Sequence, residues 1–293
     1  MCDKDTTFSI KNTLYNEKTS YLCIMKTQIT ILGTGNAFVT RCYNTCFFLH
    51  NDETALLVDA GGGNGILRQL EDAHIPISLI HDIFVTHAHT DHIIGVLWVI
   101  RLFLQQKAKG KCDGVIHIYS HEKVLRVLQG MMTDLLPKKL SAQIGTTVLF
   151  HELRDRDVFD VGNIHFQCFD ILSTKEKQFG FTAWLPDGQW LVCLGDEPYN
   201  EHNRELVEGA DWLMSEAFCK YADRDTFKPY EKHHSTARDA ALLAEQLGIK
   251  NLILYHTEDK TIATRKQAYT AEAREVYNGN VYVPDDLETI PLG

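Results

Sequence analysis

The stretch Ile83-Phe-Val-Thr-His-Ala-His-Thr-Asp-His92 decides the fold, because four candidate metal ligands directly follow an apolar run. His87 and His89 are two residues apart, and alternate residues of an extended chain project to the same side, so this pair can bind one ion. Asp91 and His92 stand where the chain turns into a predicted helix, and they can face a second ion. Imidazole nitrogen and carboxylate oxygen are both good zinc ligands. This spacing predicts a metal centre rather than a polar turn with some histidines.

Three further candidate ligands lie elsewhere in the chain. Asp59, Asp196 and His256 each end an apolar run that is typical of a β-strand. The carboxyl ends of strands are where α/β folds assemble their sites. Singly, each aspartate is as readily a turn residue or a helix cap. Together with the histidine cluster, the three residues predict a site for two metal ions.

The order of the predicted elements indicates the fold class. Apolar runs typical of strands lie at 28–33, 46–49, 55–58, 82–86, 115–119, 147–150, 164–171, 179–185, 190–194 and 251–255. Helical patterns lie near 64–73, 93–107, 121–130, 236–247 and 263–277. Each half of the chain supplies strands and then helices, which favours an α/β sandwich of two packed sheets with helices outside. With 293 residues, 44% of them hydrophobic, the chain can bury a sizeable core as a single domain.

The first residues differ from the rest of the chain. Residues 1–24 are polar and show no clear periodicity, whereas the first apolar run begins soon after Met25. We therefore expect residues 1–24 to be a disordered extension, or an over-long start, and residues 25–293 to form the folded domain.

The formal net charge of −10 limits the classes of partner. Non-specific binding to nucleic acid depends on Lys and Arg that neutralise phosphates, so the charge disfavours that class. It does not exclude a nucleic-acid substrate, because metal ions add positive charge to a site. No run approaches the roughly 20 apolar residues of a membrane span, and the N-terminus lacks the apolar core of a signal peptide. We expect no membrane partner.

The eight cysteines are scattered and form no C-x-x-C pair. A disulfide scaffold and a structural zinc cluster both need closer cysteine spacing. Some cysteines, such as Cys168 and Cys193, lie within apolar runs and are expected to be small core residues. This usage predicts a reducing, cytoplasmic setting.

These motifs resemble a known superfamily. His87-Ala-His-Thr-Asp-His92 matches the H-x-H-x-D-H signature of the metallo-β-lactamase superfamily. Further segments resemble its ribonuclease Z-like branch, over roughly residues 26–258: Leu32-Gly-Thr-Gly-Asn-Ala37, Arg41, Asn44, Val58-Asp-Ala-Gly61, Ser215-Glu-Ala-Phe218 and His234-Ser-Thr236. The resemblance implies a four-layered αββα sandwich, the metallo-β-lactamase fold, with hydrolase activity. It also implies a homodimer.

The resemblance further implies a role for each ligand. Two zinc ions are expected, with Mn²⁺ as an alternative metal. The expected ligands are His87 and His89 for the first ion, Asp91, His92 and His256 for the second, and Asp196 as the bridge between them.

The catalytic set that the resemblance implies is Asp91, Asp59, Glu216 and His234. Asp59 is expected to hold ligands in place through hydrogen bonds, as metal-binding histidines generally require. Glu216 and His234 are expected to form a proton relay that protonates the leaving oxygen. The alternative interpretation is that Glu216 is a solvated carboxylate and that His234 lies in a helix-capping loop.

The chain departs from the family at one position. Relatives carry another histidine ligand of the first zinc before an aromatic-Gly-aromatic segment, and here that position falls near Leu172. Leucine cannot bind zinc. The first site would keep His87, His89 and Asp196 with a place for water, which can suffice for catalysis but predicts lower affinity. Asp170, Ser173 or another residue is a candidate to compensate for it.

Three functions are compatible with these residues. The first is a zinc-dependent phosphodiesterase, in which a metal-bound hydroxide attacks the phosphorus of RNA or of a small molecule. The second is a hydrolase of a lactone, thioester or other ester, because the same chemistry can act on a carbonyl. The third is a metal-binding protein without enzymatic activity, because the first zinc site is weakened.

A tRNA-processing endonuclease is the less favoured form of the first function. Ribonuclease Z proteins that act on tRNA carry a long basic arm containing Gly and Pro outside the site. The corresponding stretch here, 108–145, is short and includes Met131-Met-Thr-Asp-Leu-Leu-Pro137. Together with the acidic net charge, it favours a smaller phosphodiester or another mode of binding RNA.

Overall fold

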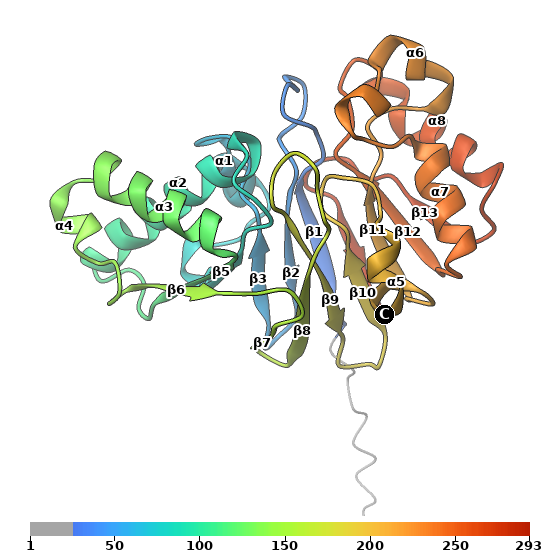
Figure 1. Cartoon of the computed structure of the whole chain (residues 1–293). Helices are drawn as coiled ribbons and strands as arrows, with labels where there is room; N and C mark the ends of the chain where they lie inside the picture. Colours follow the sequence, from blue (N-terminus) through green and yellow to red (C-terminus); the bar gives the residue numbers. More distant parts are fainter. Residues whose placement is uncertain (1–25) are drawn as a thin grey trace, which may run out of the picture.

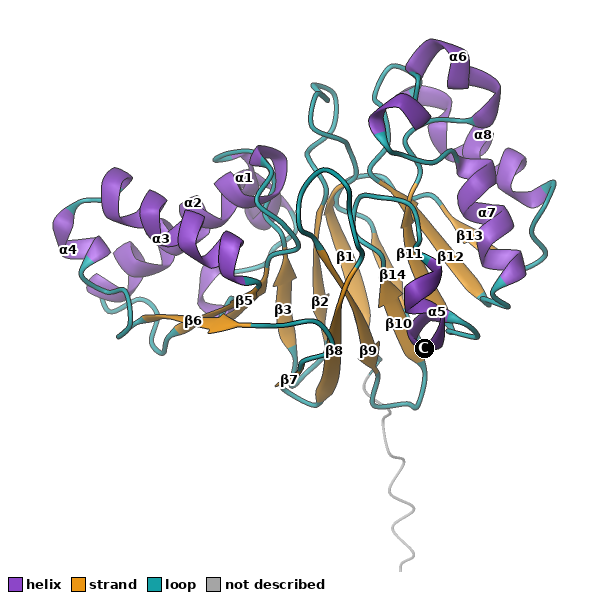
Figure 2. Ribbon diagram, viewed as in Figure 1, coloured by secondary structure: helices purple, strands orange, loops and turns teal. Residues whose placement is uncertain are grey.

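The computed structural model describes residues 26–293, in which two β-sheets pack face to face and helices cover both outer faces (Figure 1). The expectation for residues 1–24 lies outside the described residues. The strand orders are β14-β1-β2-β3-β4-β5-β6 and β13-β12-β11-β10-β9-β8-β7. Figure 2 shows the two sheets between two groups of helices, so the predicted α/β, four-layered αββα sandwich is confirmed.

The first sheet contains strands from both ends of the described chain. Its strands are β1 (Gln28–Gly33), β2 (Cys46–His50), β3 (Ala55–Val58), β4 (Asp82–Phe84), β5 (Ile116–Ser120), β6 (Val148–Glu152) and β14 (Thr289–Pro291). The pairs from β14 to β3 are antiparallel, whereas those from β3 to β6 are parallel. The carboxyl ends of β3 and β4 therefore lie side by side, which brings Asp59 next to the histidine cluster.

The second sheet is parallel over its later strands. Its strands are β7 (Val158–Val161), β8 (Ile164–Asp170), β9 (Phe179–Trp184), β10 (Trp190–Cys193), β11 (Trp212–Glu216), β12 (Asn251–Tyr255) and β13 (Asn280–Tyr282). Strands β10 to β13 pair in parallel. Their carboxyl ends meet at one edge, where Asp196, Glu216 and His256 come together.

The helices divide between the two outer faces (Figure 1). The first group is α1 (Gly65–Asp72), α2 (Thr90–Ala108), α3 (Glu122–Leu135) and α4 (Lys138–Ser141). The second group is α5 (Arg204–Val207), α6 (Arg224–Phe227), α7 (Ala237–Gln246) and α8 (Ile262–Arg274). Short 3-10 helices lie at η1 (Ile77–Leu79), η2 (Glu201–Asn203), η3 (Tyr221–Asp223) and η4 (Tyr230–Lys232). Helix α7 begins with a reciprocal capping box between Thr236 and Asp239, which fixes its start beside His234.

Aromatic side chains fill the space between the sheets. Phe84 of the first sheet packs edge to face on Phe181 of the second, with ring centroids 5.3 Å apart. Phe166 packs on Phe181 in the same manner at 5.6 Å. The three rings are fully buried, and the contact of Phe84 with Phe181 joins the two sheets through the core.

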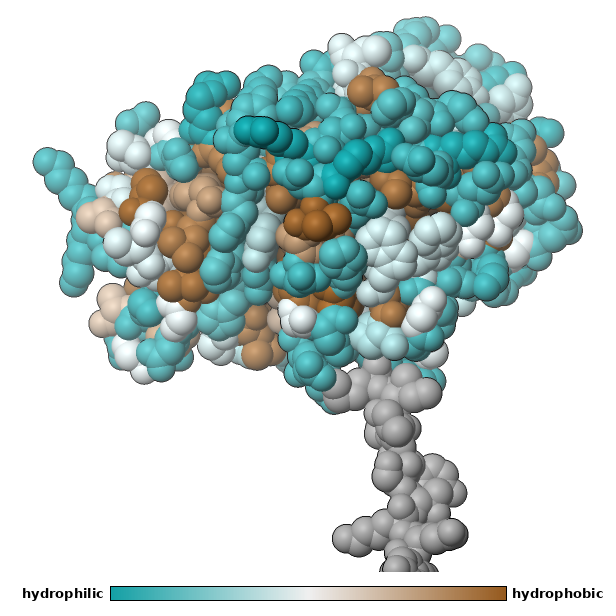
Figure 3. Space-filling model, turned by 60° about the horizontal axis from the view of Figure 1, so that its bottom comes forward, coloured by the Kyte–Doolittle hydropathy of each residue, from teal (hydrophilic) through white to brown (hydrophobic). Residues whose placement is uncertain are grey.

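Cys168 and Cys193 are buried in this core, as predicted. The cysteines within residues 26–293 are all free thiols. Across that same range, none of the helices combines the length and the apolar composition needed to cross a membrane. Most of the surface in Figure 3 is hydrophilic, with smaller apolar patches between.

Candidate metal centre

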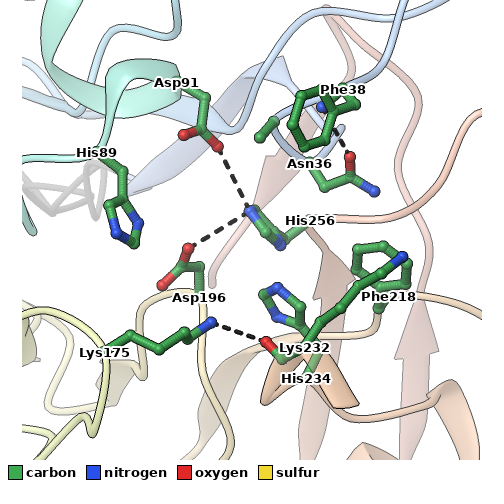
Figure 4. Close-up of a pocket in the computed structure, with 11 residues that line it drawn as sticks. Asn36, Phe38, His89, Asp91, Lys175, Asp196, Phe218, Lys232, His234 and His256 are labelled. Carbon is green, nitrogen blue, oxygen red and sulfur yellow. Dashed lines mark hydrogen bonds and ion pairs between the residues drawn. The ribbon is translucent and has the colours of Figure 1, made fainter. Parts of the chain in front are cut away.

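The candidate site is a cavity of about 280 Å³ at the edge where carboxyl ends of strands from both sheets meet. Figure 4 shows the side chains that surround it. The lining residues are Asn36, Ala37, Phe38, His89, Asp91, Lys175, Asp196, Phe218, Lys232, His234 and His256.

The first predicted metal position lies between His87, His89 and Asp196. His87 Nε2 is 2.8 Å from His89 Nδ1 and 3.5 Å from Asp196 Oδ2. Nitrogen ligands of a tetrahedral zinc ion lie roughly 3.4 Å apart, given a Zn–N bond of about 2.0–2.1 Å. The two histidines therefore need only a small adjustment to share one ion.

The second predicted position lies between Asp91, His92 and His256. Asp91 Oδ2 is 3.4 Å from His92 Nε2 and 3.8 Å from His256 Nε2. Asp196 Oδ2 is 3.7 Å from the same nitrogen of His92 and 3.6 Å from that of His256. Asp196 thus stands between the two positions, as expected for a bridging ligand, and all six predicted ligands converge.

The residues present fit a pair of cations. Among the described residues, His92 Nε2 and His256 Nε2 have no hydrogen-bond partner, although both atoms are buried. A buried polar atom without a partner is costly, and a metal ion would satisfy each nitrogen. His87, His92 and Asp196 form one group able to hold a metal, and Asp91, His92 and His256 form another. The assignment of metal ligands remains a prediction.

Asp59 sets the tautomers of two histidines. The Thr86 hydroxyl donates its one hydrogen to Asp59 Oδ2 at 2.7 Å, so at its 2.9 Å contact with His87 Nδ1 it must accept. Asp59 Oδ2 also accepts from His92 Nδ1 at 2.7 Å. In its neutral form each ring then carries its hydrogen on Nδ1, and each Nε2 points toward Asp196 Oδ2. Burial lowers the pKa of His92, but Asp59 and Asp91 outweigh it and hold this pKa well above its ordinary value, so a cation bound there would displace a proton from His92. Asp59 occupies the supporting position that the sequence predicted.

Local backbone features place these side chains. Asp59 and His256 adopt left-handed backbone conformations, with φ of 54° and 57°. Such conformations are uncommon outside glycine and often mark functional sites. Gly95 lets α2 approach closely, because a Cβ there would lie 1.7 Å from Ala60 O. This contact seats the first turn of α2, which carries Asp91 and His92, against the loop after β3.

The electrostatics keep the carboxylates ionised. Burial raises the pKa of Asp91, but the electrostatic contacts of its carboxylate with His256 and His92 outweigh burial, so this pKa lies below its ordinary value. Burial likewise raises the pKa of Asp196, but the electrostatic contacts with the surrounding imidazoles outweigh it, so this pKa is also lowered. Burial holds the pKa of His87 well below its ordinary value. Two charged carboxylates and a neutral imidazole are the forms that bind a cation.

The predicted relay pair also meets. Glu216 Oε2 lies 3.5 Å from His234 Nδ1. Glu216 is fully buried and accepts a hydrogen bond from Ser235 N, so the alternative of a solvated carboxylate is wrong. The His234 ring stacks on Phe218 with centroids 4.9 Å apart and faces the cavity.

Leu172 does not stand in for a ligand. It is 47% exposed, its φ is 58°, and its N–H donates to Asp170 Oδ1 at 2.8 Å. Ser173 donates instead to Glu197 Oε1 at 2.7 Å. In the part of the chain that the structure describes, neither Asp170 nor Ser173 joins a metal-capable group. The hydrogen bonds of Asp170 and Ser173 engage both side chains elsewhere, and compensation for the missing histidine by either residue stays a prediction.

The sequence did not indicate several residues of the site. Gln178 is 1% exposed and contacts both His87 and Asp196. Phe38 and Lys175 line the cavity from loops, and Lys232 lines it from the end of η4. A lone glutamine, phenylalanine or lysine carries no spacing signal, so only the folded contacts reveal these residues.

Comparison with known proteins places these features in a family. The model of the family described as anti-Pycsar protein Apyc1 matches residues 27–281. Ribonuclease Z from a strain of Bacillus cereus is 30% identical over 177 residues, which are 60% of this chain and 53% of that protein. Ribonuclease Z from a strain of Bacillus mycoides is 29% identical over 177 residues, with the same coverage. The chain spans about half the length of the curated relatives it matches.

Solved structures share the fold at low identity. YhfI from Bacillus subtilis, a metallo-β-lactamase fold protein, aligns with a TM-score of 0.73 and 18% identity over 91% of this chain and 99% of its own. The short form of human tRNase Z aligns with a TM-score of 0.69 and 22% identity over the same shares. Yeast PDE1 aligns with a TM-score of 0.66 and 16% identity over 90% of this chain and 99% of its own.

The resemblance to the ribonuclease Z-like branch is thus confirmed, although the sequence motifs did not separate one family of that branch from another. The family model covers most of the chain, and the solved structures share its fold. The protein therefore belongs to the family described as anti-Pycsar protein Apyc1, on the metallo-β-lactamase fold.

Proposed function

We propose that this protein is a metal-dependent phosphodiesterase that hydrolyses a small phosphodiester. The observation that carries the proposal is the convergence of six ligand side chains next to the Glu216–His234 pair. Divalent ions there, Zn²⁺ or alternatively Mn²⁺, would neutralise the phosphoryl oxygens and activate the attacking water.

The protein's own residues supply the remaining steps. Asp59 holds the imidazoles of His87 and His92 in the orientation that faces the cavity. His234 directs Nδ1 to Glu216, so its other nitrogen faces the substrate and protonates the leaving oxygen. Glu216, whose Oε2 lies 3.5 Å from His234 Nδ1, orients this ring.

The size of the cavity favours a small substrate. Its volume of about 280 Å³ is at the lower end of ligand pockets, which measure roughly 300–1,000 Å³. Lys175 and Lys232 bring positive charge to the rim. Lys175 Nζ lies 3.3 Å from Glu197 Oε1, so much of its charge is already neutralised. Because little uncompensated positive charge remains at the rim, a single phosphodiester fits the site better than a long polyanion does.

Phe38 is placed to contact the rest of the substrate. Its side chain is 91% exposed at the mouth of the cavity, next to Asn36 (Figure 4). The loop that carries it is anchored by Asp259 Oδ2, which accepts from Thr40 N at 2.6 Å and Arg41 N at 3.0 Å. A large apolar ring held outward by an anchored loop is typical of a binding residue.

The experiment is a substrate panel with the purified, metal-loaded protein. The panel contains bis(p-nitrophenyl) phosphate, a dinucleotide, a cyclic mononucleotide, a precursor tRNA, a lactone, a thioester and a p-nitrophenyl ester. We expect turnover of small diesters and slow or no cleavage of the tRNA. The variants His87→Ala and Asp196→Asn should lose this activity, whereas His165→Ala, at an exposed histidine of β8, should keep it.

Each other outcome favours a different function. Turnover of the esters alone would contradict the proposal and favour an ester hydrolase. Metal binding without turnover of any substrate would favour a protein that binds metal but is not an enzyme. The cytoplasmic setting and the homodimer also remain predictions, and sedimentation velocity of the purified protein tests the homodimer.

A further inference from the structure

Gln178 clamps the carboxylate of Asp196 from outside the cavity. Its Oε1 accepts from Asp196 N at 3.0 Å, and its Nε2 donates to Asp196 Oδ1. The two bonds fix which end of the amide is oxygen. In the reversed orientation, the NH₂ group would face the N–H of Asp196 and the amide oxygen would face Asp196 Oδ1, so neither hydrogen bond could form. The Nε2 atom also lies 3.2 Å from His87 Nδ1. That nitrogen already donates to Thr86, so this last contact is packing rather than a hydrogen bond.

The clamp leaves Asp196 with one oxygen for the cavity. Oδ1 is occupied by the amide, while Oδ2 lies 3.5 Å, 3.7 Å and 3.6 Å from the Nε2 atoms of His87, His92 and His256. A carboxylate that is free to rotate could chelate one ion through both oxygens. With Oδ1 engaged, Asp196 instead presents a single oxygen midway between the two metal positions.

The backbone is shaped to admit this clamp. Gly195 has φ of 82°, and a Cβ there would lie 2.4 Å from Gln178 Oε1. The backbone at this position is held by two hydrogen bonds. Gln178 O accepts from Ile171 N at 3.1 Å, and the next residue, Phe179, donates its N–H to Thr86 O at 3.0 Å. The amide therefore sits on a fixed backbone and is 1% exposed.

The loop that ends at Gln178 is the one in which relatives carry the missing histidine. Here Leu172 turns outward to solvent, so this loop gives the first metal position no direct ligand from that residue. Its contribution reaches the site through the contact of Gln178 with Asp196.

We propose that Gln178 is a positioning residue that orients Asp196 and so sustains the first metal position without the third histidine. The inference rests on the proposed metal site. Hydrogen-bond partners of metal ligands generally contribute about 10- to 100-fold in metal affinity, and the loss expected here is of that size.

The test compares metal binding in Gln178→Leu, which lacks both bonds, and Gln178→Glu, which has the same shape but lacks the donor. Gln69→Leu is the matched control, because Gln69 is also buried and its amide donates to Leu32 O, away from the site. Stoichiometry comes from elemental analysis, and affinity comes from Zn²⁺ competition with a chromogenic chelator. Thermal unfolding of the metal-free proteins reports folding.

We expect wild type and Gln69→Leu to bind two ions, and both Gln178 variants to bind one of the two roughly 10- to 100-fold more weakly. If Gln178→Leu does not fold, the isosteric Gln178→Glu decides the question alone. Unchanged affinity for both ions in the folded variants would overturn the role of Gln178 and leave the proposed metal site intact. Fewer than two ions in the wild type would overturn both proposals.

Discussion

His92 donates its Nδ1 hydrogen to Asp59 across 2.7 Å, and the opposite nitrogen of the ring is buried without a hydrogen-bond partner between Asp91 and Asp196. This hydrogen bond makes the metal-facing state of His92 depend on a residue that does not itself face the cavity.

Replacing Asp59 with asparagine should therefore reverse the tautomer of His92. The new amide can keep its oxygen on Thr86 N, where Asp59 Oδ1 now accepts at 2.8 Å, and would then turn its NH₂ group toward His92 Nδ1. The ring hydrogen would move to Nε2 and block the metal. Metal affinity should fall roughly 10- to 100-fold, as measured by chelator competition. Asp82→Asn, at a carboxylate that accepts from the Tyr119 hydroxyl, should leave affinity unchanged. Wild-type affinity in Asp59→Asn would contradict the tautomer argument.

Removing the imidazole of His234 should slow the reaction without releasing metal. His234→Ala should reduce kcat roughly 10²- to 10⁴-fold on a diester with an alkoxide leaving group, because that oxygen needs a proton. The loss should be much smaller on bis(p-nitrophenyl) phosphate, because p-nitrophenolate leaves without protonation. Steady-state kinetics on both substrates, with metal content measured in parallel, check the expectation. An equal loss on both substrates would show that His234 does not act as the acid, and His202→Ala, at an exposed histidine, serves as the control.

Truncating Phe38 should weaken substrate binding and leave the chemical step intact. The ring is 91% exposed, so Phe38→Ala should change the free energy of unfolding by less than about 0.5 kcal/mol. Losing about 1.5 kcal/mol of apolar contact with the substrate corresponds to a roughly tenfold rise in KM, with kcat nearly constant. Leu135→Ala, at another exposed apolar residue, should change neither constant. A fall in kcat with an unchanged KM would show that the ring does not contribute to substrate binding.

Restoring histidine at position 172 should not add a metal ligand. Leu172 faces solvent from a left-handed backbone, so an imidazole there would extend away from the cavity. We expect Leu172→His to bind the same number of ions as wild type in elemental analysis. An additional ion per chain, or a higher affinity, would show that the loop rearranges around the new side chain.

The buried and half-buried thiols of residues 26–293 should resist alkylation in the folded protein. Burial raises the pKa of Cys42 to about 11 and that of Cys219 to about 12, so near pH 8 these thiols hold their protons. Because the thiolate is the reactive form, iodoacetamide labelling should increase only as the pH rises toward these values. Mass spectrometry of a Cys2→Ser/Cys23→Ser variant should show little labelling near pH 8 and full labelling in denaturant. Rapid labelling of the folded variant near pH 8 would contradict the raised pKa values.

Much of the fold could be predicted because the apolar runs are continuous and end in turns. The runs at 55–58 and 251–255 coincide with β3 and β12, whose side chains are almost all buried. Strand β11 was missed because its last two residues, Ser215 and Glu216, are polar. Both residues are buried, and the contacts of Glu216 with Ser235, 19 positions later, have no signal in the sequence. Strand β14 was missed because its three residues, which end in Pro291, are too few to show an apolar run or an alternation of apolar and polar side chains.

The site could be predicted to the extent that its residues cluster in the sequence. His87, His89, Asp91 and His92 are recognisable from spacing, and the structure brings them together with Asp196 and His256. The role of Gln178 could not be predicted in this way. It depends on a hydrogen bond to a residue 18 positions away and on the space left by a glycine, and neither appears as a motif.

The pairing of β14 with β1 has a consequence for how the protein is made. Thr30 and Thr289 are hydrogen-bonded neighbours across these strands, although 259 positions separate them. On the ribosome, this edge of β1 stays unpaired until residues 289–291 have been synthesised, whereas β2, which pairs with the other edge, follows β1 closely in the chain. Contacts between distant segments form slowly, and unpaired strand edges invite association with other chains. The edge of β1 that β14 covers is therefore the edge of this strand that stays open longer during synthesis.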